Sequence, residues 1–267
     1  MPSIKLALVV VSALIAGVMN SVAGAGTLVT FPALVALGLP PIGANATSTV
    51  ALWPASITSM WGYRGELRGS GLWALGFAVP SLLGGGLGAF LLLRTPAERF
   101  SDIVPWLVLG ATALFMVQRP IMRWLALRPQ QQSRARIDLT QNDELLTSRW
   151  PPASILGYQF LVAIYGGYFG AGVGILMLAA LGFMGLHNIH RMNGLKNWGG
   201  LCMNAVAATM FAFTSLVSWP VALAMAVGAM CGGYLGSRAA QRVPQEFVRA
   251  AVVAIGLSSG VLLYFTR

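Results

Sequence analysis

Residues 170–176 read GAGVGIL and interrupt the long apolar run 152–186. The stretch VAGAGTL, residues 22–28, interrupts the first apolar run of the chain in the same way. An ungapped offset of 148 residues, the separation between Gly24 and Gly172, superposes the two breaks. Each break is therefore predicted to divide a helix into two arms, because closely spaced glycines are poor helix formers.

The same offset superposes two further motifs. It aligns GGxLG at Gly84 with GGxLG at Gly232, and RxPxE at Arg94 with RxPxE at Arg242. Because one gap-free offset accounts for all of these matches, the chain is predicted to be a duplicated unit of four apolar segments. The first repeat, the linker and the second repeat are predicted at residues 1–125, 126–151 and 152–267.

The composition is that of an integral membrane protein. The chain has 57% hydrophobic and 9% charged residues, against about 25% charged in soluble domains. Every segment is predicted to be a helix, because a bilayer requires backbone groups to pair internally. The predicted segments are 4–38, 43–63, 70–93, 103–125, 152–186, 192–214, 217–237 and 247–265. The net charge of +10 does not indicate nucleic-acid binding, because most arginines lie between apolar runs, where cytoplasmic loops place them.

The topology depends on how often the two broken segments cross the membrane. If each crosses once, there are eight crossings and the two halves are parallel. The basic residues then divide almost evenly between the two sides of the membrane. If each enters and returns, Arg64, Arg68 and Arg238 share one side with the linker, as the positive-inside rule favours. The second arms, about 27–38 and 174–186, would also reach only ~18–20 Å, short of a core of ~30 Å. We therefore predict inverted repeats with re-entrant arms, a cytoplasmic linker and both termini outside.

Residues 193–204, NGLKNWGGLCMN, place a polar stripe inside an apolar segment. Asn193, Lys196 and Asn197 fall on one helical face. Lys196 is one of only two lysines in the chain, and an ionisable residue within the membrane indicates a functional site. The repeat offset carries this stripe onto Asn45, Ser48 and Thr49 in the first half.

These stripes and the two breaks together predict an anion site. The breaks free backbone N–H groups at the start of the following half-helices, where the helix dipole attracts anions. Lys196 would supply a full charge, and asparagine and hydroxyl side chains would donate hydrogen bonds to a small oxyanion, a sulfonate or a carboxylate. The predicted substrate-binding residues are Lys196, Asn193, Asn197, Asn45, Thr47, Ser48, Gly24, Gly26, Thr27, Gly172 and Gly174. The alternative is that the small and polar residues only pack helices together and that Lys196 reaches the membrane surface.

Other chemistry finds little support in the sequence. His187 and His190 lack a third ligand nearby, so no metal or other cofactor is predicted. No nucleophile has an orienting partner, so we predict that the protein is not an enzyme. Cys202 and Cys231 are interpreted as packing residues.

All the acids lie in or beside loops, which disfavours a membrane carboxylate as a proton carrier. Facilitated efflux, or coupling through the substrate's own protonation, stays open.

With these residues in view, the chain resembles the sulfite exporter TauE/SafE family, also called the four-toluenesulfonate uptake permease family, over nearly its whole length. The resemblance rests on AGAGTLVTFPALVALGLPP at 23–41, ANATS at 44–48, GGYFGAGVG at 166–174 and HRMNGLK at 190–196. It implies a multi-pass carrier of the inner membrane that moves sulfite, sulfoacetate or a related sulfonate, often outward. The expected partners are thus a small anionic substrate and the lipid bilayer. A homo-oligomer stays open, as do a membrane assembly factor without transport activity and a membrane-embedded enzyme.

Overall fold

The computed structural model describes residues 3–127, 150–183, 186, 188–239 and 245–265. In this part of the chain every regular element is a helix, which confirms the predicted all-α fold. The helices are α1 (Ser3–Ala23), α2 (Thr27–Ala36), α3 (Pro41–Gly62), α4 (Gly71–Arg94), α5 (Ala97–Leu127), α7 (Ala153–Tyr168), α8 (Val173–Phe183), α9 (Ile189–Ala212), α10 (Trp219–Ala239) and α11 (Gln245–Phe265). Of the predicted linker 126–151, the first two residues continue α5, and residues 128–149 lie outside the described residues.

Two helices begin earlier than their apolar patterns predicted, because polar residues start them. α5 begins at Ala97 instead of residue 103, and Glu98 in its first turn complements the positive end of the helix dipole. α9 begins at Ile189 instead of residue 192. The side chain of Asn188 caps it by accepting hydrogen bonds from the backbone N–H groups of His190 and Arg191, at 3.0 and 3.3 Å.

Three helices of the described residues are long and apolar enough to cross a membrane: α4, the stretch Ala97–Val117 of α5, and α10. α3 and α9 are of similar length, 22 and 24 residues, but they carry the polar stripes. α2 and α8 contain only 10 and 11 residues, which corresponds to about 15–17 Å against a core of ~30 Å. The predicted interruption of both first segments by a short break is therefore confirmed.

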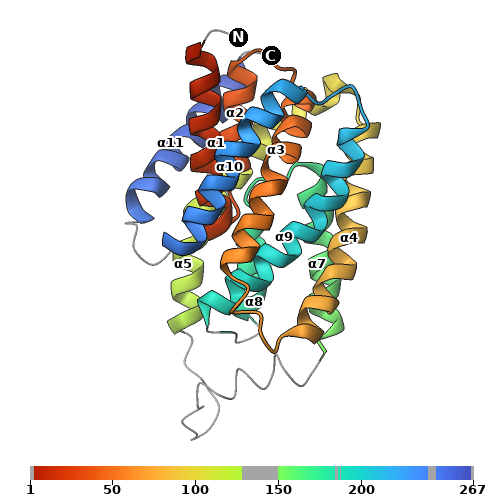
Figure 1. Ribbon diagram of the computed structural model, residues 1–267, viewed down its shortest axis with the longest axis vertical. Helices are drawn as coiled ribbons and strands as arrows, with labels where there is room; N and C mark the ends of the chain where they lie inside the picture. Colours follow the sequence, from red (N-terminus) through yellow and green to blue (C-terminus); the bar gives the residue numbers. More distant parts are fainter. Residues whose placement is uncertain (1–2, 128–149, 184–185, 187, 240–244, 266–267) are drawn as a thin grey trace, which may run out of the picture.

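The helices of the two halves interlock in matched pairs. The repeat offset relates α1–α5 to α7–α11. α1 packs against α10 as α7 packs against α4, and α3 packs against α10 as α9 packs against α4. α2 likewise contacts α11 as α8 contacts α5, and α3 contacts its own counterpart, α9 (Figure 1). The contacts thus have an approximate two-fold symmetry in which each half completes the packing of the other.

The repeated glycine motifs bring these helices into close contact. A Cβ atom added at Gly84 of α4 would lie 2.6 Å from the carbonyl oxygen of Phe160 in α7. A Cβ atom added at its counterpart on α10, Gly232, would collide with the carbonyl oxygen of Leu14 in α1. The GGxLG motifs therefore pack helices together, as small residues commonly do in membranes.

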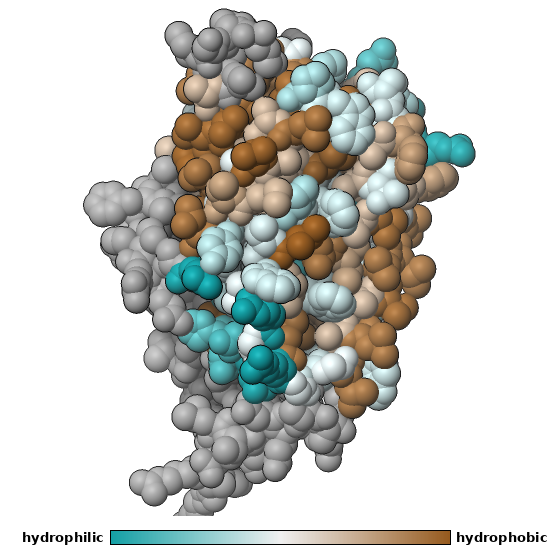
Figure 2. Space-filling model, in the orientation of Figure 1, coloured by the Kyte–Doolittle hydropathy of each residue, from teal (hydrophilic) through white to brown (hydrophobic). Residues whose placement is uncertain are grey.

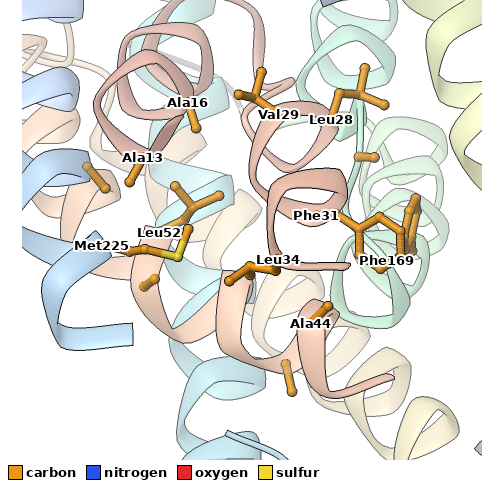
Figure 3. Packing of buried hydrophobic residues seen from close by; sticks show 14 of the residues in the cluster. Ala13, Ala16, Leu28, Val29, Phe31, Leu34, Ala44, Leu52, Phe169 and Met225 are labelled. Atoms are coloured by element: carbon orange, nitrogen blue, oxygen red, sulfur yellow. The ribbon is translucent and has the colours of Figure 1, made fainter. Parts of the chain in front are cut away.

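The short helix α2 is anchored by side chains from both halves. Leu28, Phe31 and Leu34 form its buried face. The ring of Phe31 meets that of Phe169 edge to face, with centroids 5.3 Å apart, and Figure 3 shows this pair within the core. Because Phe169 lies at the break between α7 and α8, the packing ties the first broken segment to the second.

The ends of the first and last helices lie opposite the junction between the two halves. The first turn of α1 and the last turn of α11 lie at the top of Figure 1, whereas the last turn of α5 and the first turn of α7 lie at the bottom. In Figure 2, hydrophobic residues lie at the upper left and along the right side of the face, and hydrophilic residues gather lower, left of the centre. Arg64 follows α3, and Arg238 lies in the last turn of α10.

Candidate functional site

The two glycine breaks meet at the centre of the interlocked halves. Gly24 and its counterpart Gly172 adopt φ values of +69° and +73°, a left-handed conformation that glycine adopts without steric cost. A Cβ atom added at Gly174 would lie 2.6 Å from the Cα of Gly24 and 2.8 Å from the carbonyl oxygen of Ala23. The backbones of the two breaks therefore touch directly, and no side chain fits between them.

Lys196 lies beside this contact in the interior. Its side chain is 2% exposed, and its Cδ would lie 3.0 Å from a Cβ added at Gly174. Its Nζ donates hydrogen bonds to the carbonyl oxygens of Ser21 and Asn20, at 2.8 and 3.3 Å. These carbonyls belong to the last turn of α1, where the helix dipole favours a cation. The Asn20 carbonyl also accepts a hydrogen bond from the backbone N–H of Gly24, at 3.1 Å. The structure thus places the Lys196 amine in the protein interior at the helix breaks, and not on the protein surface.

The asparagines of the same stripe lie next to Lys196. Asn197 donates a hydrogen bond from Nδ2 to the carbonyl oxygen of Ser21, at 3.1 Å, so that this oxygen accepts from two side chains. Asn193, one turn earlier on α9, is 7% exposed, and its Oδ1 has no hydrogen-bond partner among the described residues. A buried polar atom without a partner is costly. This atom is therefore a candidate contact for a ligand or a water molecule.

The stripe of the first half makes an equivalent contact without a charge. Asn45 donates a hydrogen bond from Nδ2 to the carbonyl oxygen of Tyr168, at 2.9 Å, in the last turn of α7. Tyr168 is the counterpart of Asn20, so the third helix segment of each half caps the broken helix of the other half. The hydroxyl of Ser48 pairs with that of Thr30, at 2.6 Å, and Thr47 accepts a hydrogen bond from the backbone N–H of Ser218, at 3.0 Å.

The remaining predicted residues surround the breaks from other sides. A Cβ added at Gly26 would lie 2.6 Å from the carbonyl oxygen of Ala16 in α1, whereas one at Gly172 would make ordinary contact with Ala111 of α5. Thr27 is half-buried at the first position of α2. The structure thus gathers Gly24, Gly174, Lys196 and Asn197 at one point. The other predicted residues of the first half form the adjoining helix contacts.

Sequence reasoning missed two polar residues near this point. Ser21, fully buried in α1, provides the carbonyl that Lys196 and Asn197 share. Gln159 of α7 is 1% exposed and donates a hydrogen bond to the Ser81 hydroxyl, at 2.9 Å. Its Nε2 would lie 3.1 Å from a Cβ at Gly199, one turn after Lys196. An amide inside the apolar sequence ASILGYQFLVAIYGGY was a signal that could have identified Gln159.

The cysteines and histidines are not gathered at the breaks. Cys202 is buried, but Cys231 is exposed on α10, so its interpretation as a packing residue was wrong. The apolar residues around Cys231 in the sequence could not show whether its own side chain faces the interior or the outside of the helix bundle. His187 lies outside the described residues, and within the described residues no three metal-ligating side chains cluster.

Together these features define a helical membrane protein of two equivalent halves, whose broken helices meet at a buried lysine. The chain belongs to the sulfite exporter TauE/SafE family, whose family model matches residues 9–263. The resemblance inferred from the motifs is therefore confirmed, and membership in a family of membrane transporters supports a transport role.

Several curated relatives extend over most of this chain. It is 28% identical to the probable membrane transporter protein ORF9 of Sinorhizobium sp, over 97% of this chain and 92% of the relative. It is 27% identical to the probable membrane transporter protein YfcA of Escherichia coli K12, over 94% and 87% of the two chains. A probable membrane transporter protein of Haemophilus influenzae is 25% identical, over 90% and 86%. No solved structure matches the chain.

Proposed function

We propose that this protein is a multi-pass secondary transporter of the inner membrane that exports a small sulfur-containing anion, such as sulfite or sulfoacetate. The observation that carries the proposal is the position of Lys196, which is buried beside the contact between the two glycine breaks. The name of the family supports the sulfur-containing substrate. Among the described residues no carboxylate pairs with the Lys196 amine. Such a buried amine favours an anionic ligand, because burial of an unpaired cation is costly.

The geometry supports a specific mode of binding. An ammonium group has three N–H donors, and two of those of Lys196 point to the carbonyls of Asn20 and Ser21. The third would donate to the anion. The first turn of α8, which contains Gly174, would add backbone N–H groups and the positive end of its dipole. Asn193 and Asn197 would bind further oxygens, and Asn45, Thr47 and Ser48 would hold α3 against the breaks.

Binding and flux measured on the same preparation would test this function. Sulfite, thiosulfate, sulfate and sulfoacetate are expected to raise the melting temperature of detergent-purified protein, because a ligand at 100 times its Kd stabilises by about 2.7 kcal/mol. The zwitterion taurine is expected to stabilise less, since its ammonium group opposes Lys196. In proteoliposomes, the stabilising anions should exchange across the membrane. Absence of both stabilisation and flux for every anion would contradict the proposal.

We further propose that the two halves are inverted repeats that expose the site alternately to the two sides of the membrane. The matched helix pairs support this arrangement, as does the location of α1 and α11 termini opposite the junction of α5 and α7 (Figure 1). Arg64, Arg191 and Arg238 follow or begin helices at the junction end, which the positive-inside rule places in the cytoplasm. Inverted repeats of this kind commonly transport by rocking around a central site.

The topology can be tested with reporter fusions. A fluorescent protein that folds only in the cytoplasm should be bright when inserted after residue 135 and dark when fused after Arg267. Alkaline phosphatase, which is active only outside the cytoplasm, should give the reverse pattern. The linker and the C-terminus would then lie on opposite sides. The same compartment for both positions would contradict inverted repeats with an odd number of crossings between them.

A further inference from the structure

The repeat offset assigns to Asn193 a hydrogen bond that Lys196 makes in its place. Asn45, the counterpart of Asn193, donates from Nδ2 to the carbonyl oxygen of Tyr168, at 2.9 Å. The counterpart of Tyr168 is Asn20, and its carbonyl oxygen accepts from the Nζ of Lys196, at 3.3 Å. The amine therefore occupies the position at the end of α1 that the repeat assigns to the asparagine amide.

The side-chain amide of Asn193 is thereby available to a ligand. The residue is 7% exposed, and neither end of its amide has a hydrogen-bond partner among the described residues. The Oδ1 of Asn45 also lacks a partner among these residues, but the bond from its Nδ2 holds that amide in place. Buried amides are normally paired, and side chains at i and i+3 are neighbours on a helix. The Asn193 amide thus lies where it can contact a group that binds Lys196.

An amide at this position restricts the chemistry of the ligand, because it offers an acceptor as well as N–H donors. The other groups assigned to the anion, the Lys196 ammonium and the backbone N–H groups at the start of α8, are all donors. A fully ionised oxyanion has only acceptor oxygens, so it would leave the Oδ1 of Asn193 unpaired in the interior, which is costly. An anion that keeps one O–H group would satisfy the donors with its bare oxygens and the Oδ1 with its hydroxyl.

The charge of the site favours the same kind of ligand. Lys196 is 2% exposed and supplies one positive charge when it is protonated. A singly charged anion would neutralise this charge, whereas a dianion would leave a second negative charge in the interior, which is costly. The dipole at the start of α8 contributes only about half a charge, which is too little to balance a dianion.

Other titratable groups lie on the helices that pack against α9, which are α1, α3, α4, α7 and α8. α3 and α8 contain no charged or titratable residue, and α1 has only Lys5, in its first turn. On α7, Tyr158 and Tyr165 donate to backbone carbonyls, at 3.3 and 2.7 Å. Titration of any protein group would change the binding of every anion, so a comparison among anions isolates a proton on the ligand. The remaining groups on these helices, on α9 and in the connection from α3 to α4 are Tyr63, Arg64, Glu66, Arg68, Arg94, Tyr168, His190, Arg191 and Cys202.

We propose that the site selects a singly charged oxyanion that keeps one O–H group, and that Asn193 recognises this hydroxyl through its Oδ1. The inference rests on the proposed transport function and specifies the form in which the anion binds. For sulfite this form is hydrogensulfite, which coexists with the sulfite dianion near neutral pH. Its O–H group donates to Asn193 while its other oxygens accept from Lys196 and from α8. A carrier of this form moves a proton with its substrate and needs no carboxylate of its own within the membrane.

Calorimetric titrations of detergent-purified protein at two pH values test the preference. Between about pH 6 and about pH 8, sulfite changes from mostly hydrogensulfite to mostly dianion. Methanesulfonate stays a monoanion with a methyl group in place of the hydroxyl, and sulfate stays a dianion. At about pH 6, sulfite should bind at least about fivefold more tightly than methanesulfonate. At about pH 8, the affinity for sulfite relative to methanesulfonate should fall about fivefold, whereas that for sulfate relative to methanesulfonate should not change.

Asn193→Leu tests the recognition of the hydroxyl, because leucine has a similar volume but no amide. The variant should bind methanesulfonate at least as tightly as the wild type, while the advantage of sulfite over methanesulfonate at about pH 6 should disappear. Asn193→Ala provides a second removal of the amide if the leucine variant does not fold. Thr209→Val is the control, since it removes an exposed hydroxyl that bonds within α9, and it should keep the wild-type ratio.

The possible outcomes distinguish this inference from the transport function. A ratio of sulfite to methanesulfonate affinity that is equal at both pH values, or that rises with pH, would overturn the preference and leave the transporter in place. A wild-type ratio in both Asn193 variants would overturn the recognition of the hydroxyl by this residue. Absence of binding by every anion at both pH values would instead overturn the proposed function.

Discussion

Replacing Lys196 by methionine is expected to abolish the stabilisation of the protein by sulfite and sulfoacetate and to eliminate anion flux. Methionine has a similar length and suits the buried position, so the change removes the charge with little loss of packing. In a site shielded from water, a charge-assisted hydrogen bond is worth about 1.5–3 kcal/mol, and without it the anion would be buried with no opposite charge. Differential scanning fluorimetry with the anion panel provides the measurement.

The matched control for this variant is Lys5→Met, which removes the only other lysine of the chain. It has the same change in net charge and should behave as wild type. The Lys196→Met protein without ligand should melt within a few degrees of wild type, because the loss of a buried ammonium also removes its desolvation cost. Full anion stabilisation in Lys196→Met would exclude Lys196 from the binding site.

Replacing Gly174 by alanine is expected to lower stability and to stop transport. The added methyl group would lie 2.6 Å from the Cα of Gly24 and 2.8 Å from the Ala23 carbonyl oxygen, both backbone atoms. Overpacking of this kind costs about 1–3 kcal/mol, which lowers the melting temperature of a chain of this size by several degrees. The two breaks would also move apart at the point where the halves must slide. Melting curves and proteoliposome flux measure the two effects separately.

Gly200→Ala is the control, because Gly200 lies one turn from Lys196 on α9 with open space around its Cα. Alanine in a helix interior is more favourable than glycine by about 0.5–1 kcal/mol, so this variant should melt slightly higher than wild type. If Gly174→Ala matched Gly200→Ala in both stability and flux, the contact between the breaks would have no role in transport.

The sequence was sufficient to predict the helices and their breaks. Apolar length located the segments, and the repeated glycines at Gly24 and Gly172 identified where two of them end early. Polar residues explain where α9 and α5 begin, since Asn188 and Glu98 lie at helix starts that precede the apolar segments. These features depend on neighbours within a few residues, which is the range over which sequence patterns are informative.

The arrangement of the site could not be predicted in the same way. The Lys196 amine reaches the carbonyl of Ser21, 175 residues earlier, and this contact depends on how the two halves interlock. Ser21 gave no signal, because isolated hydroxyl residues are common in apolar helices. Thr47 and Ser48 fitted the polar stripe, but hydrogen bonds to Ser218 and Thr30 engage them in the structure. Only the second stripe carries the charge.

That imbalance bears on why the two halves occupy one polypeptide. The offset that relates Asn45 to Asn193 also relates Ser48 to Lys196, so the two positions are geometric equivalents with different chemistry. A pair of identical separate subunits would place either two amines or none at such a centre, since symmetry copies every substitution. Fusion of the genes removes that restriction and allows a single positive charge per molecule.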